Sequence, residues 1–233
     1  RLIPVLDRVS GSKSICPLRL IVMNDSIQVA LIDDHVVVRA GYRLLLESAG
    51  GFDILMESGD PDAALEDPKL AKADIIILDL NLGGRSGFEF IEKILNLKAE
   101  ARILVFSIHD ESLYVHRALE SGALGYLCKQ CDPACMITAV KTVARGEAYL
   151  DPGLVLSPKG KGALHRDPAS ELTSREFQVF ELLVQGLSSR EIAQRLGLTA
   201  KTVSNYLTTI KEKFGTDSTV ELMRLAYDQI LKR

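Results

Sequence analysis

The sequence lacks a long apolar run, a secretory signal and a glycine-rich phosphate loop. No uninterrupted apolar stretch approaches the ~20 residues that a membrane-spanning helix needs. Residues 1–26 are basic, but they contain no compact apolar segment of the kind that directs secretion. These absences predict a cytosolic protein. Residues 1–26 also fit no domain pattern, so we expect a disordered or non-native extension, with Met23 as a candidate start.

Cysteine is scarce, and most of it is concentrated at one place. Three of the four cysteines lie within eight residues, at Cys128, Cys131 and Cys135. His109 and His116 lie upstream, but no fourth zinc ligand stands at a matching spacing. We therefore expect reduced cysteines at the end of a buried strand and the start of the next helix. A redox-sensitive thiol pair is the alternative.

Charge is distributed unevenly along the 233-residue chain. Residues 27–148 carry 12 basic and 19 acidic side chains, a net charge of −7, whereas residues 168–233 carry 9 basic and 8 acidic side chains, a net charge of +1. The composition is 47% hydrophobic and 25% charged, which argues against a disordered chain or a coiled coil. A domain typically holds ~100–200 residues, so the length of the chain allows two domains. The uneven charge predicts two domains with different partners.

Short apolar runs alternate with amphipathic segments from residue 27 to residue 147. The run Ile75–Leu78 is apolar on both faces, which is typical of the middle of a parallel sheet. Five strand–helix units in about 120 residues predict a doubly wound α/β domain of flavodoxin-like size, with a five-stranded parallel sheet. We expect strands at Ile27–Ile32, Phe52–Glu57, Ala73–Leu80, Arg102–Ser107 and Gly125–Lys129, and helices at Val36–Ala49, Pro61–Leu70, Gly87–Leu97, Glu111–Ser121 and Pro133–Ala144.

Polar side chains stand where these strands end. Asp33 and Asp34 follow the first strand, Asp79 follows the third, Ser107 ends the fourth and Lys129 ends the fifth. In doubly wound sheets, functional groups lie at the carboxyl ends of the strands. We therefore expect three carboxylates, one hydroxyl and one lysine to converge on one rim of the sheet.

Physical chemistry restricts what such a cluster can do. Neighbouring carboxylates repel one another, so a cation must neutralise them. With oxygen ligands and no histidine for zinc, the rim is expected to bind Mg²⁺. Aspartate is a nucleophile in aspartyl-phosphate chemistry, while a lysine can pair with a phosphoryl oxygen and a hydroxyl can donate a hydrogen bond to it.

The set Asp33-Asp34, Asp79, Ser107 and Lys129 resembles that of a two-component receiver domain, which has the CheY-like fold. The resemblance implies that a histidine kinase phosphorylates Asp79. It also implies a Mg²⁺ ion held by Asp33, Asp34, Asp79 and the backbone carbonyl of Asn81.

The same resemblance implies a switch beside the phosphoryl group. Ser107 is its hydroxyl, Lys129 binds the phosphoryl group, and Tyr126 matches an aromatic residue that changes rotamer on phosphorylation. An ordinary half-buried strand tyrosine is the alternative for Tyr126. Receivers usually carry proline four residues after the acceptor, whereas this chain has Gly83-Gly84, so we expect a looser loop.

Proline, glycine and charged residues are frequent in residues 148–170, which predicts a linker between two domains. Residues 171–233 then show start signals for four short helices. Capping boxes begin at Thr173, Ser188 and Ser218, each with a glutamate three residues later, and Thr199 is expected to cap the third helix. The second half of the chain is therefore predicted to be a small all-α domain.

The second and third of these helices, joined by Gly197-Leu198-Thr199, have a helix-turn-helix layout. The outward face of the third helix is polar and basic, so it can hydrogen-bond base edges in a major groove. A solvated helix face is the alternative. The residues of this face are Lys201, Ser204, Asn205, Thr208 and Lys211.

Residues Leu172–Ala226 resemble a LuxR-type helix-turn-helix domain. The motifs are Leu172-Thr173-Ser174-Arg175-Glu176, Gly186-Leu187-Ser188, Glu191-Ile192-Ala193 and Lys201-Thr202-Val203. Together with the receiver they resemble the NarL/FixJ family over residues 27–230, and Val203-Ser204-Asn205-Tyr206 is similar to its BvgA/EvgA branch. The resemblance implies base contacts from Ser204, Asn205 and Thr208, DNA phosphate contacts from Lys201, Thr202 and Lys211, and a buried Val203.

The sequence thus predicts a transcription regulator rather than an enzyme. Phosphorylation of Asp79 by a sensor histidine kinase would control the binding of a homodimer to paired sites in promoter DNA, with RNA polymerase as a further partner. The main alternative is a phosphate-independent DNA-binding regulator whose receiver is a docking module. A phosphohydrolase is less favoured because Asn81 replaces its second aspartate, and thiol control through Cys128 and Cys131 is a further hypothesis.

Overall fold

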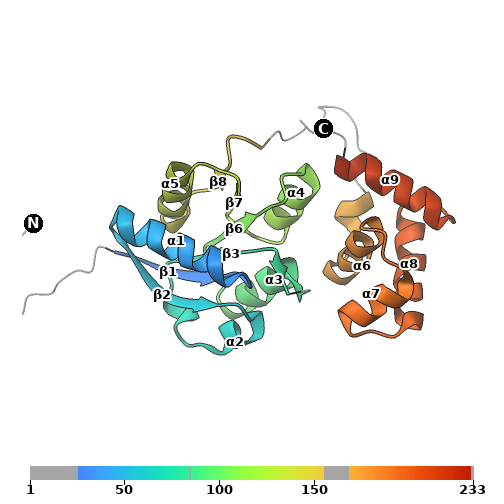
Figure 1. Cartoon of the computed structure of the whole chain (residues 1–233), viewed down its shortest axis with the longest axis horizontal. Coiled ribbons are helices and arrows are strands. Elements are labelled where there is room, and N and C mark those ends of the chain that lie inside the picture. Colours follow the sequence, from blue (N-terminus) through green and yellow to red (C-terminus); the bar gives the residue numbers. More distant parts are fainter. Residues whose placement is uncertain (1–25, 84, 155–167, 232–233) are drawn as a thin grey trace, which may run out of the picture.

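The computed structural model describes residues 26–83, 85–154 and 168–231 of the chain. An α/β domain and a smaller helical domain lie side by side (Figure 1). The predicted N-terminal extension and most of the predicted linker lie outside the described residues.

The α/β domain is built on a parallel sheet with six strands rather than the predicted five. Its strand order is β2-β1-β3-β6-β7-β8. The sixth strand, β8, pairs with β7 through Gly125–Tyr149 and Tyr126–Leu150, within the stretch predicted as a linker. Two residues give no readable alternation, which is why the sequence did not reveal it. The strands are β1 (Ile27–Ile32), β2 (Phe52–Ser58), β3 (Ile75–Leu78), β6 (Ile103–Ser107), β7 (Gly125–Cys128) and β8 (Tyr149–Leu150).

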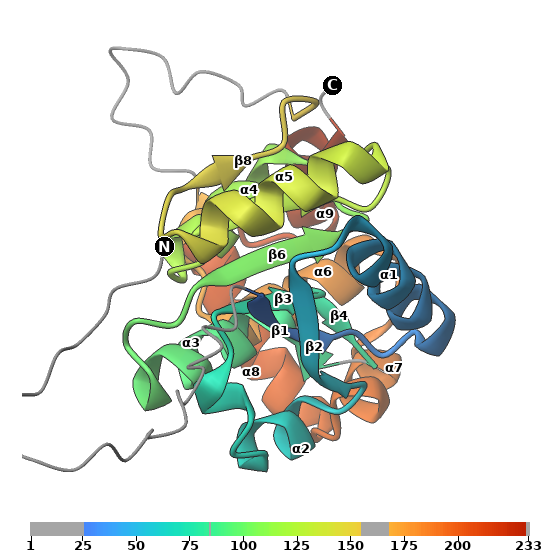
Figure 2. The same ribbon diagram turned by 90° about the vertical axis from the view of Figure 1, so that its left-hand side faces the viewer.

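Helices cover both faces of this sheet (Figure 2). Apolar side chains of α1 (Val36–Ala49) and α5 (Pro133–Ala144) share one core with one face of the strands. The opposite core includes α2 (Pro61–Glu66), α3 (Gly87–Leu97) and α4 (Ser112–Glu120). All four residues of β3 are buried, as expected for a strand between two helical layers.

The predicted helix Pro61–Leu70 is wrong in its length. The helix α2 ends at Glu66, and a separate 3₁₀ turn, η1 (Leu70–Lys72), follows it. Asp67 adopts an extended conformation with ψ of 118°, and Pro68 follows it. Because proline disfavours the helical conformation of the residue before it, the apolar pattern alone overestimated the helix.

A small hairpin follows the third strand of the sheet. The strand β4 (Asn81–Leu82) pairs antiparallel with β5 (Arg85–Ser86), and Gly83 between them has a positive φ of 62°. Glycine adopts this conformation without steric cost, whereas proline cannot adopt a positive φ. Gly83, the departure from the receiver pattern, therefore takes a conformation that proline could not adopt.

The helical domain contains the four predicted helices: α6 (Ser174–Val184), α7 (Ser189–Leu196), α8 (Ala200–Lys213) and α9 (Thr219–Leu231). A 3₁₀ turn, η2 (Pro168–Glu171), precedes them. Thr173 and Ser188 form complete capping boxes, and the Thr199 side chain caps α8, as predicted. At Ser218 the hydroxyl accepts a hydrogen bond from Glu221 N, but the Glu221 carboxylate binds Arg224.

The two domains share one apolar core. Phe88 of α3, Tyr114 of α4 and Phe177 of α6 form edge-to-face contacts, with centroids 5.4 Å and 5.5 Å from that of Phe177. These rings join the α2–α4 side of the sheet to the interior of the helical domain. Aromatic contacts of this kind contribute about 0.5–1.5 kcal/mol each beyond their buried area.

Candidate phosphorylation site and DNA-binding surface

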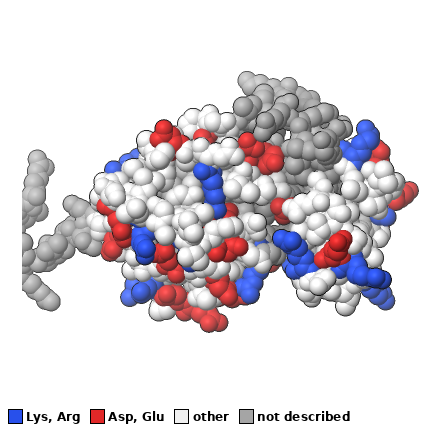
Figure 3. Space-filling view, viewed as in Figure 1, with Lys and Arg blue, Asp and Glu red and all other residues white. Residues whose placement is uncertain are grey.

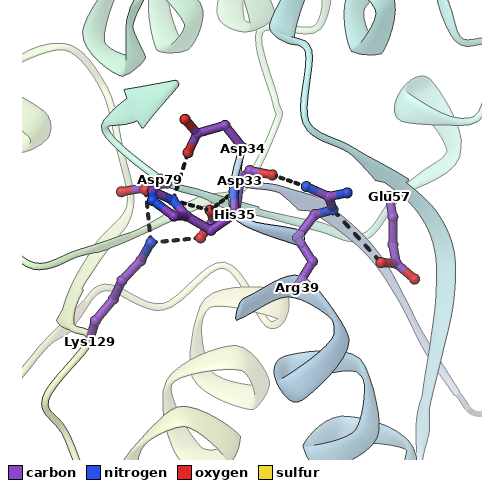
Figure 4. Close-up of polar contacts among 7 residues, drawn as sticks. All are labelled: Asp33, Asp34, His35, Arg39, Glu57, Asp79 and Lys129. Carbon is purple, nitrogen blue, oxygen red and sulfur yellow. Dashed lines mark hydrogen bonds and ion pairs between the residues drawn. The ribbon is translucent and has the colours of Figure 1, made fainter. Parts of the chain in front are cut away.

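The predicted polar groups converge at one rim of the sheet. Asp33 follows β1, Asp79 follows β3, Ser107 ends β6 and Lys129 follows β7. The ammonium Nζ of Lys129 lies 2.6 Å from Asp33 Oδ2 and 2.8 Å from Asp79 Oδ2 (Figure 4). Because both carboxylates are at least 95% buried, this lysine supplies their nearest positive charge.

Backbone packing fixes the position of Asp79. Gly87 N donates a hydrogen bond to Leu80 O at 2.9 Å. A side chain at Gly87 would place its Cβ only 2.7 Å from Asp79 O and 2.6 Å from Leu80 Cα. Glycine therefore allows the start of α3 to approach the strand end that carries Asp79.

Burial is the largest influence on the Asp79 carboxyl. It raises the pKa of Asp79 above the usual carboxyl value, while the hydrogen bond and charge of Lys129 lower the same pKa. The charge of Asp33 raises it further, and a hydrogen bond from the Asn81 backbone lowers it. A second positive charge at the rim would favour the ionised form that phosphoryl transfer requires.

The chemistry of the donor set fits a divalent cation. Asp34 Oδ1 is buried and has no hydrogen-bond partner within the described part of the chain. Asp33 and Asp79 offer further carboxylate oxygens close by. Hard oxygen ligands of this kind suit Mg²⁺, so these residues could hold the predicted ion. The contribution of the Asn81 carbonyl stays a prediction.

Sequence reasoning missed His35 at this rim and was wrong to expect no histidine there. Its Nδ1 lies 3.2 Å from Asp33 Oδ1 and 2.7 Å from Asp34 Oδ1. Among the described residues, Asp33, Asp34, His35 and Asp79 form the group of side chains that could share one metal ion. The signal was its position directly after the two aspartates, where the chain turns from β1 into α1.

The predicted switch residues Ser107 and Tyr126 lie close to one another behind the rim. Ser107 Oγ accepts a hydrogen bond from His109 N at 3.3 Å, and the Tyr126 hydroxyl donates to His109 O at 2.8 Å. Tyr126 and Ser107 are both fully buried. Tyr126 is therefore buried rather than half-buried on its strand, and its role in the switch stays a prediction. The backbone of His109 therefore connects the two predicted switch side chains.

His109 also connects the rim to the helical domain. Its ring stacks on Tyr114 with centroids 4.0 Å apart, and the Tyr114 hydroxyl donates to Glu181 Oε1 of α6 at 3.0 Å.

Arg117 is 6% exposed, donates to Leu172 O at 2.8 Å and lies 4.4 Å from the centre of the Phe177 ring. Ser174 Oγ donates to Glu92 Oε1 at 2.9 Å. Polar and aromatic contacts thus hold the two domains together.

The charge of Glu181 depends on its burial and on its contacts with Tyr114 and His109 of the receiver. Burial raises the pKa of Glu181, while the charge of His109 and the hydrogen bond from Tyr114 lower it. His109 Nε2 lies 3.9 Å from Glu181 Oε1, too far for a hydrogen bond. A proton on Glu181 therefore favours the packed arrangement of the domains.

The predicted DNA-reading face is accessible. Lys201, Ser204, Asn205 and Thr208 on α8 are exposed, and Val203 is fully buried, as predicted. The Thr202 hydroxyl lies 2.8 Å from that of Thr199, and Lys211 Nζ donates to Asp217 O at 3.3 Å. In the view of Figure 3, acidic side chains are spread over the larger domain and basic side chains gather on the lower part of the smaller one.

The cysteines near the rim are free. Cys128 is buried at the end of β7, and Cys131 and Cys135 are partly buried around the start of α5. Burial is the main cause that raises the pKa of Cys131 to about 11, which makes this thiol a weak nucleophile at neutral pH.

None of the described helices combines the length and apolar character needed to cross a membrane.

Comparison with known proteins agrees with both halves of the chain. The response regulator receiver domain model matches residues 29–141, and the model for bacterial regulatory proteins of the luxR family matches residues 170–226. The transcriptional regulatory protein UhpA of Escherichia coli is 38% identical over 87% of this chain and 98% of its own. The putative positive transcription regulator BvgA of Bordetella pertussis is 35% identical over 85% and 96% of the two chains.

Solved structures share the architecture. A two-component response regulator of the LuxR family from Aurantimonas sp. is 34% identical, with a TM-score of 0.53 over 55% of this chain and 92% of that chain. Promoter-bound RcsB from Salmonella enterica serovar Typhimurium has the same fold, with a TM-score of 0.62 at 24% identity over 86% and 98% of the two chains. The chain therefore belongs to the NarL/FixJ family of two-component response regulators, with a receiver domain and a LuxR-type DNA-binding domain.

Proposed function

We propose that a sensor histidine kinase phosphorylates Asp79 and that this modification controls DNA binding and transcription. The observation that carries the proposal is the buried Asp79 carboxylate, 2.8 Å from Lys129 Nζ, beside a second acidic strand end. Membership of the family shows that the protein is a response regulator. The geometry of the rim supports Asp79 as the residue that is phosphorylated. We propose that the protein acts in the cytoplasm, as a homodimer once phosphorylated, and can contact RNA polymerase.

The proposed transfer moves a phosphoryl group from nitrogen to oxygen. A carboxylate oxygen of Asp79 attacks the phosphorus of a kinase phosphohistidine, the O–P bond forms as the N–P bond breaks, and the imidazole leaves with the electron pair. Lys129 is placed to pair with a phosphoryl oxygen, and the Ser107 hydroxyl to donate to another. Mg²⁺ bound by Asp33, Asp34, Asp79 and the Asn81 carbonyl would supply further positive charge.

A continuous set of contacts supports a route from this site to the DNA-binding domain. Movement of Ser107 or Tyr126 towards the phosphoryl group would alter hydrogen bonds to the His109 backbone. The His109 ring would then shift against Tyr114, whose hydroxyl binds Glu181 of α6. The packed arrangement and the separated one are the two states that such a switch requires.

The exposed recognition face supports a particular form of control. Lys201, Ser204, Asn205 and Thr208 are accessible while the domains are packed together, so the receiver does not mask them. We infer that phosphorylation changes the position of the DNA-binding domain and its ability to pair with a second copy. A dimer places two recognition helices about one helical turn of DNA apart, or a multiple of it.

The proposed DNA contacts fall into two groups. Ser204, Asn205 and Thr208 would read base edges, whereas Lys201, Thr202 and Lys211 would contact phosphates. The solved relative RcsB is bound to a promoter, which supports DNA as the partner of this domain. Because the domain has a net charge of only +1, affinity should depend strongly on dimerisation.

The acceptor assignment is tested by Asp79→Asn in the full chain. We expect wild-type protein to incorporate label from a small-molecule phosphodonor with Mg²⁺, and the variant to incorporate none. The exposed Asp53 on β2 provides the matched control Asp53→Asn, which should label like the wild type. Unchanged labelling of Asp79→Asn would show that the acceptor is wrong.

A second hypothesis is a phosphate-independent regulator whose receiver docks another protein. Gly83, where receivers usually carry proline, is the observation that favours it. It predicts the same DNA affinity with and without phosphodonor, whereas the first proposal predicts an increase. Footprinting of genomic fragments under both conditions distinguishes the two.

A further inference from the structure

We propose that the cleft between the two domains binds the phosphoryl or carboxylate group of a small molecule. Two adjoining cavities, of about 190 Å³ and about 390 Å³, form this interdomain cleft, where α3 and the β4–β5 hairpin face α6 and α7 (Figure 1). Sites for small molecules typically have volumes of ~300–1,000 Å³, so the cleft has room for a small ligand. The proposal does not depend on phosphorylation of Asp79.

The two cavities meet at residues that carry hydrogen-bond donors and no carboxylate. Five residues line both cavities, and we call them the junction. The receiver contributes Arg85 and Ser86 of β5, and the helical domain contributes Gln178 of α6 with Arg195 and Leu196 of α7. Guanidinium, hydroxyl and amide groups can all donate to an oxygen atom. The junction therefore offers donors from both domains to an oxyanion.

Two buried side chains at the junction have unused donors. Ser86 is 8% exposed and Gln178 is 5% exposed. The Ser86 hydroxyl does not cap α3, and no other described residue accepts a hydrogen bond from it. Arg175 donates to Gln178 Oε1 at 2.7 Å, which leaves the amide NH₂ of Gln178 without a partner among the described residues. Because buried donors without partners are unfavourable, ligand oxygens would satisfy both groups.

Arg195 supplies a positive charge to the same place. It is exposed in the last turn of α7, and it forms no ion pair or side-chain hydrogen bond within the described ranges. Arg85 is less available, because it lies 2.8 Å from Asp60 Oδ1 and 2.6 Å from Asp62 Oδ2. A guanidinium can bind phosphate or carboxylate through two parallel N–H groups. Arg195 is therefore the residue that would pair with the anion.

The carboxylates of the cleft lie away from the junction. Glu181 lines only the smaller cavity, where it accepts a hydrogen bond from Tyr114. Asp62 and Glu89 line only the larger cavity, and Asp62 is paired with Arg85. An anionic group is therefore best placed at the junction, and the rest of the ligand would extend into either cavity.

A ligand at the junction would bridge the two domains. Ser86 belongs to the receiver, whereas Gln178 and Arg195 belong to the helical domain. A ligand that contacts both binds the packed arrangement more tightly than the separated one, and it stabilises that arrangement by mass action. The concentration of a small anionic compound would thus be a second input to the position of the DNA-binding domain.

The test is a ¹H–¹⁵N NMR titration of the full chain with sodium phosphate and, separately, with sodium acetate. Ionic strength is held constant with sodium chloride, and Mg²⁺ and phosphodonor are left out. We expect the side-chain NH₂ signals of Gln178 and the backbone amide signal of Ser86 to shift and to saturate. Gln178→Met identifies the NH₂ signals by their loss.

Arg195→Met should weaken binding by about tenfold or more, because a hydrogen bond to a charged group is lost. Ser86→Ala should weaken binding by a smaller factor, because it removes a neutral donor. The matched control is Arg190→Met, which removes an exposed arginine of α7 that lines neither cavity and should keep the wild-type affinity.

Saturation by phosphate supports a phosphoryl ligand, and saturation by acetate supports a carboxylate ligand. The proposal is overturned if neither anion saturates the Gln178 signals, or if Arg195→Met binds as tightly as Arg190→Met. Failure of the phosphorylation proposal would be seen separately, as missing Asp79 labelling in wild type.

Discussion

The acidic rim and the face between the two domains both bury charged groups, but they neutralise the charge differently. At the rim, Lys129 lies within 2.8 Å of carboxylate oxygens that follow two strands. At the interface, Arg117 contacts backbone carbonyls and an aromatic ring, and Glu181 receives a hydroxyl donor at 3.0 Å. Direct ion pairs therefore hold the rim, whereas the interface relies on contacts that are lost when the domains separate.

The difference shows where a switch can operate at low energetic cost. Breaking the rim would leave buried carboxylates without a cation, which is strongly unfavourable. Opening the interface returns Arg117 and Glu181 to water, so the lost contacts are largely replaced by hydration. A rigid rim beside a separable interface would allow the proposed phosphorylation of Asp79 to change the domain arrangement without unfolding the receiver.

The largest expected effect comes from removing the charge that holds the rim. Lys129→Met should lower the free energy of unfolding of the receiver by about 3 kcal/mol in urea without divalent ions, because Asp33 and Asp79 lose their shared cation. The exposed Lys72 serves as the control, and Lys72→Met should leave stability unchanged. Equal stability of Lys129→Met and wild type would mean that these ion pairs do not hold the rim.

A second effect separates the domains without touching the rim. Arg117→Met should open the interface, because it removes the buried guanidinium that contacts Leu172 O and the Phe177 ring. Small-angle scattering of monomeric chain should show a larger radius of gyration, while phosphodonor labelling of Asp79 persists. Arg145→Met removes an exposed arginine paired with Glu147 and should keep the wild-type radius. A compact Arg117→Met chain would refute the role of this contact.

A third effect is a pH dependence confined to the interface. Burial raises the pKa of Glu181 above its ordinary value of 4.5 when the domains are packed. The packed state therefore binds the proton more tightly, so packing is strongest below 4.5 and weakens as pH rises through the raised pKa. His109, Glu111 and Arg117 also act on this carboxyl.

Glu181→Gln isolates that dependence. The variant keeps a hydrogen-bond acceptor for Tyr114 but cannot ionise, so its radius of gyration should vary less with pH than that of wild type. Glu191→Gln alters an exposed carboxylate in the capping box of α7 and should keep the wild-type pH profile. If the Glu181→Gln profile matches wild type, another group controls the packing.

The smallest expected effect comes from Tyr126, which lies between the acidic rim and the interface of the two domains. Tyr126→Phe removes only the hydroxyl that donates to His109 O, so we expect a loss of about 1 kcal/mol in stability. Asp79 should still be labelled, but the gain in DNA affinity on phosphorylation should fall. Tyr206→Phe, on a partly buried ring of α8, is the control for loss of a hydroxyl. A full gain in affinity in Tyr126→Phe would remove this bond from the route.

The two regions also differ in how far the sequence predicts them. Asp79, Ser107 and Lys129 could be placed because strand ends of a parallel sheet meet at one edge, whatever the details of packing. His35 was missed because the interpretation considered carboxylates and excluded histidine. The contribution of Arg117 could not be read, since a charged residue in an amphipathic helix is ordinarily exposed.

The interface as a whole has no local signal. Phe88, Tyr114 and Phe177 each fit the apolar face of a separate helix, and their contact depends on how two domains meet. Periodicity predicts faces but not which faces pair. The strand β8 was missed for a related reason, because its two residues are defined by pairing with β7 rather than by a pattern of their own.

Amide hydrogen exchange of the full chain, with and without phosphodonor, tests the central claim most directly. If phosphorylation of Asp79 separates the domains, peptides covering α4 and residues 168–177 should exchange faster in labelled wild type, and not in Asp79→Asn. Unchanged exchange in both segments while Asp79 is fully labelled would contradict the account.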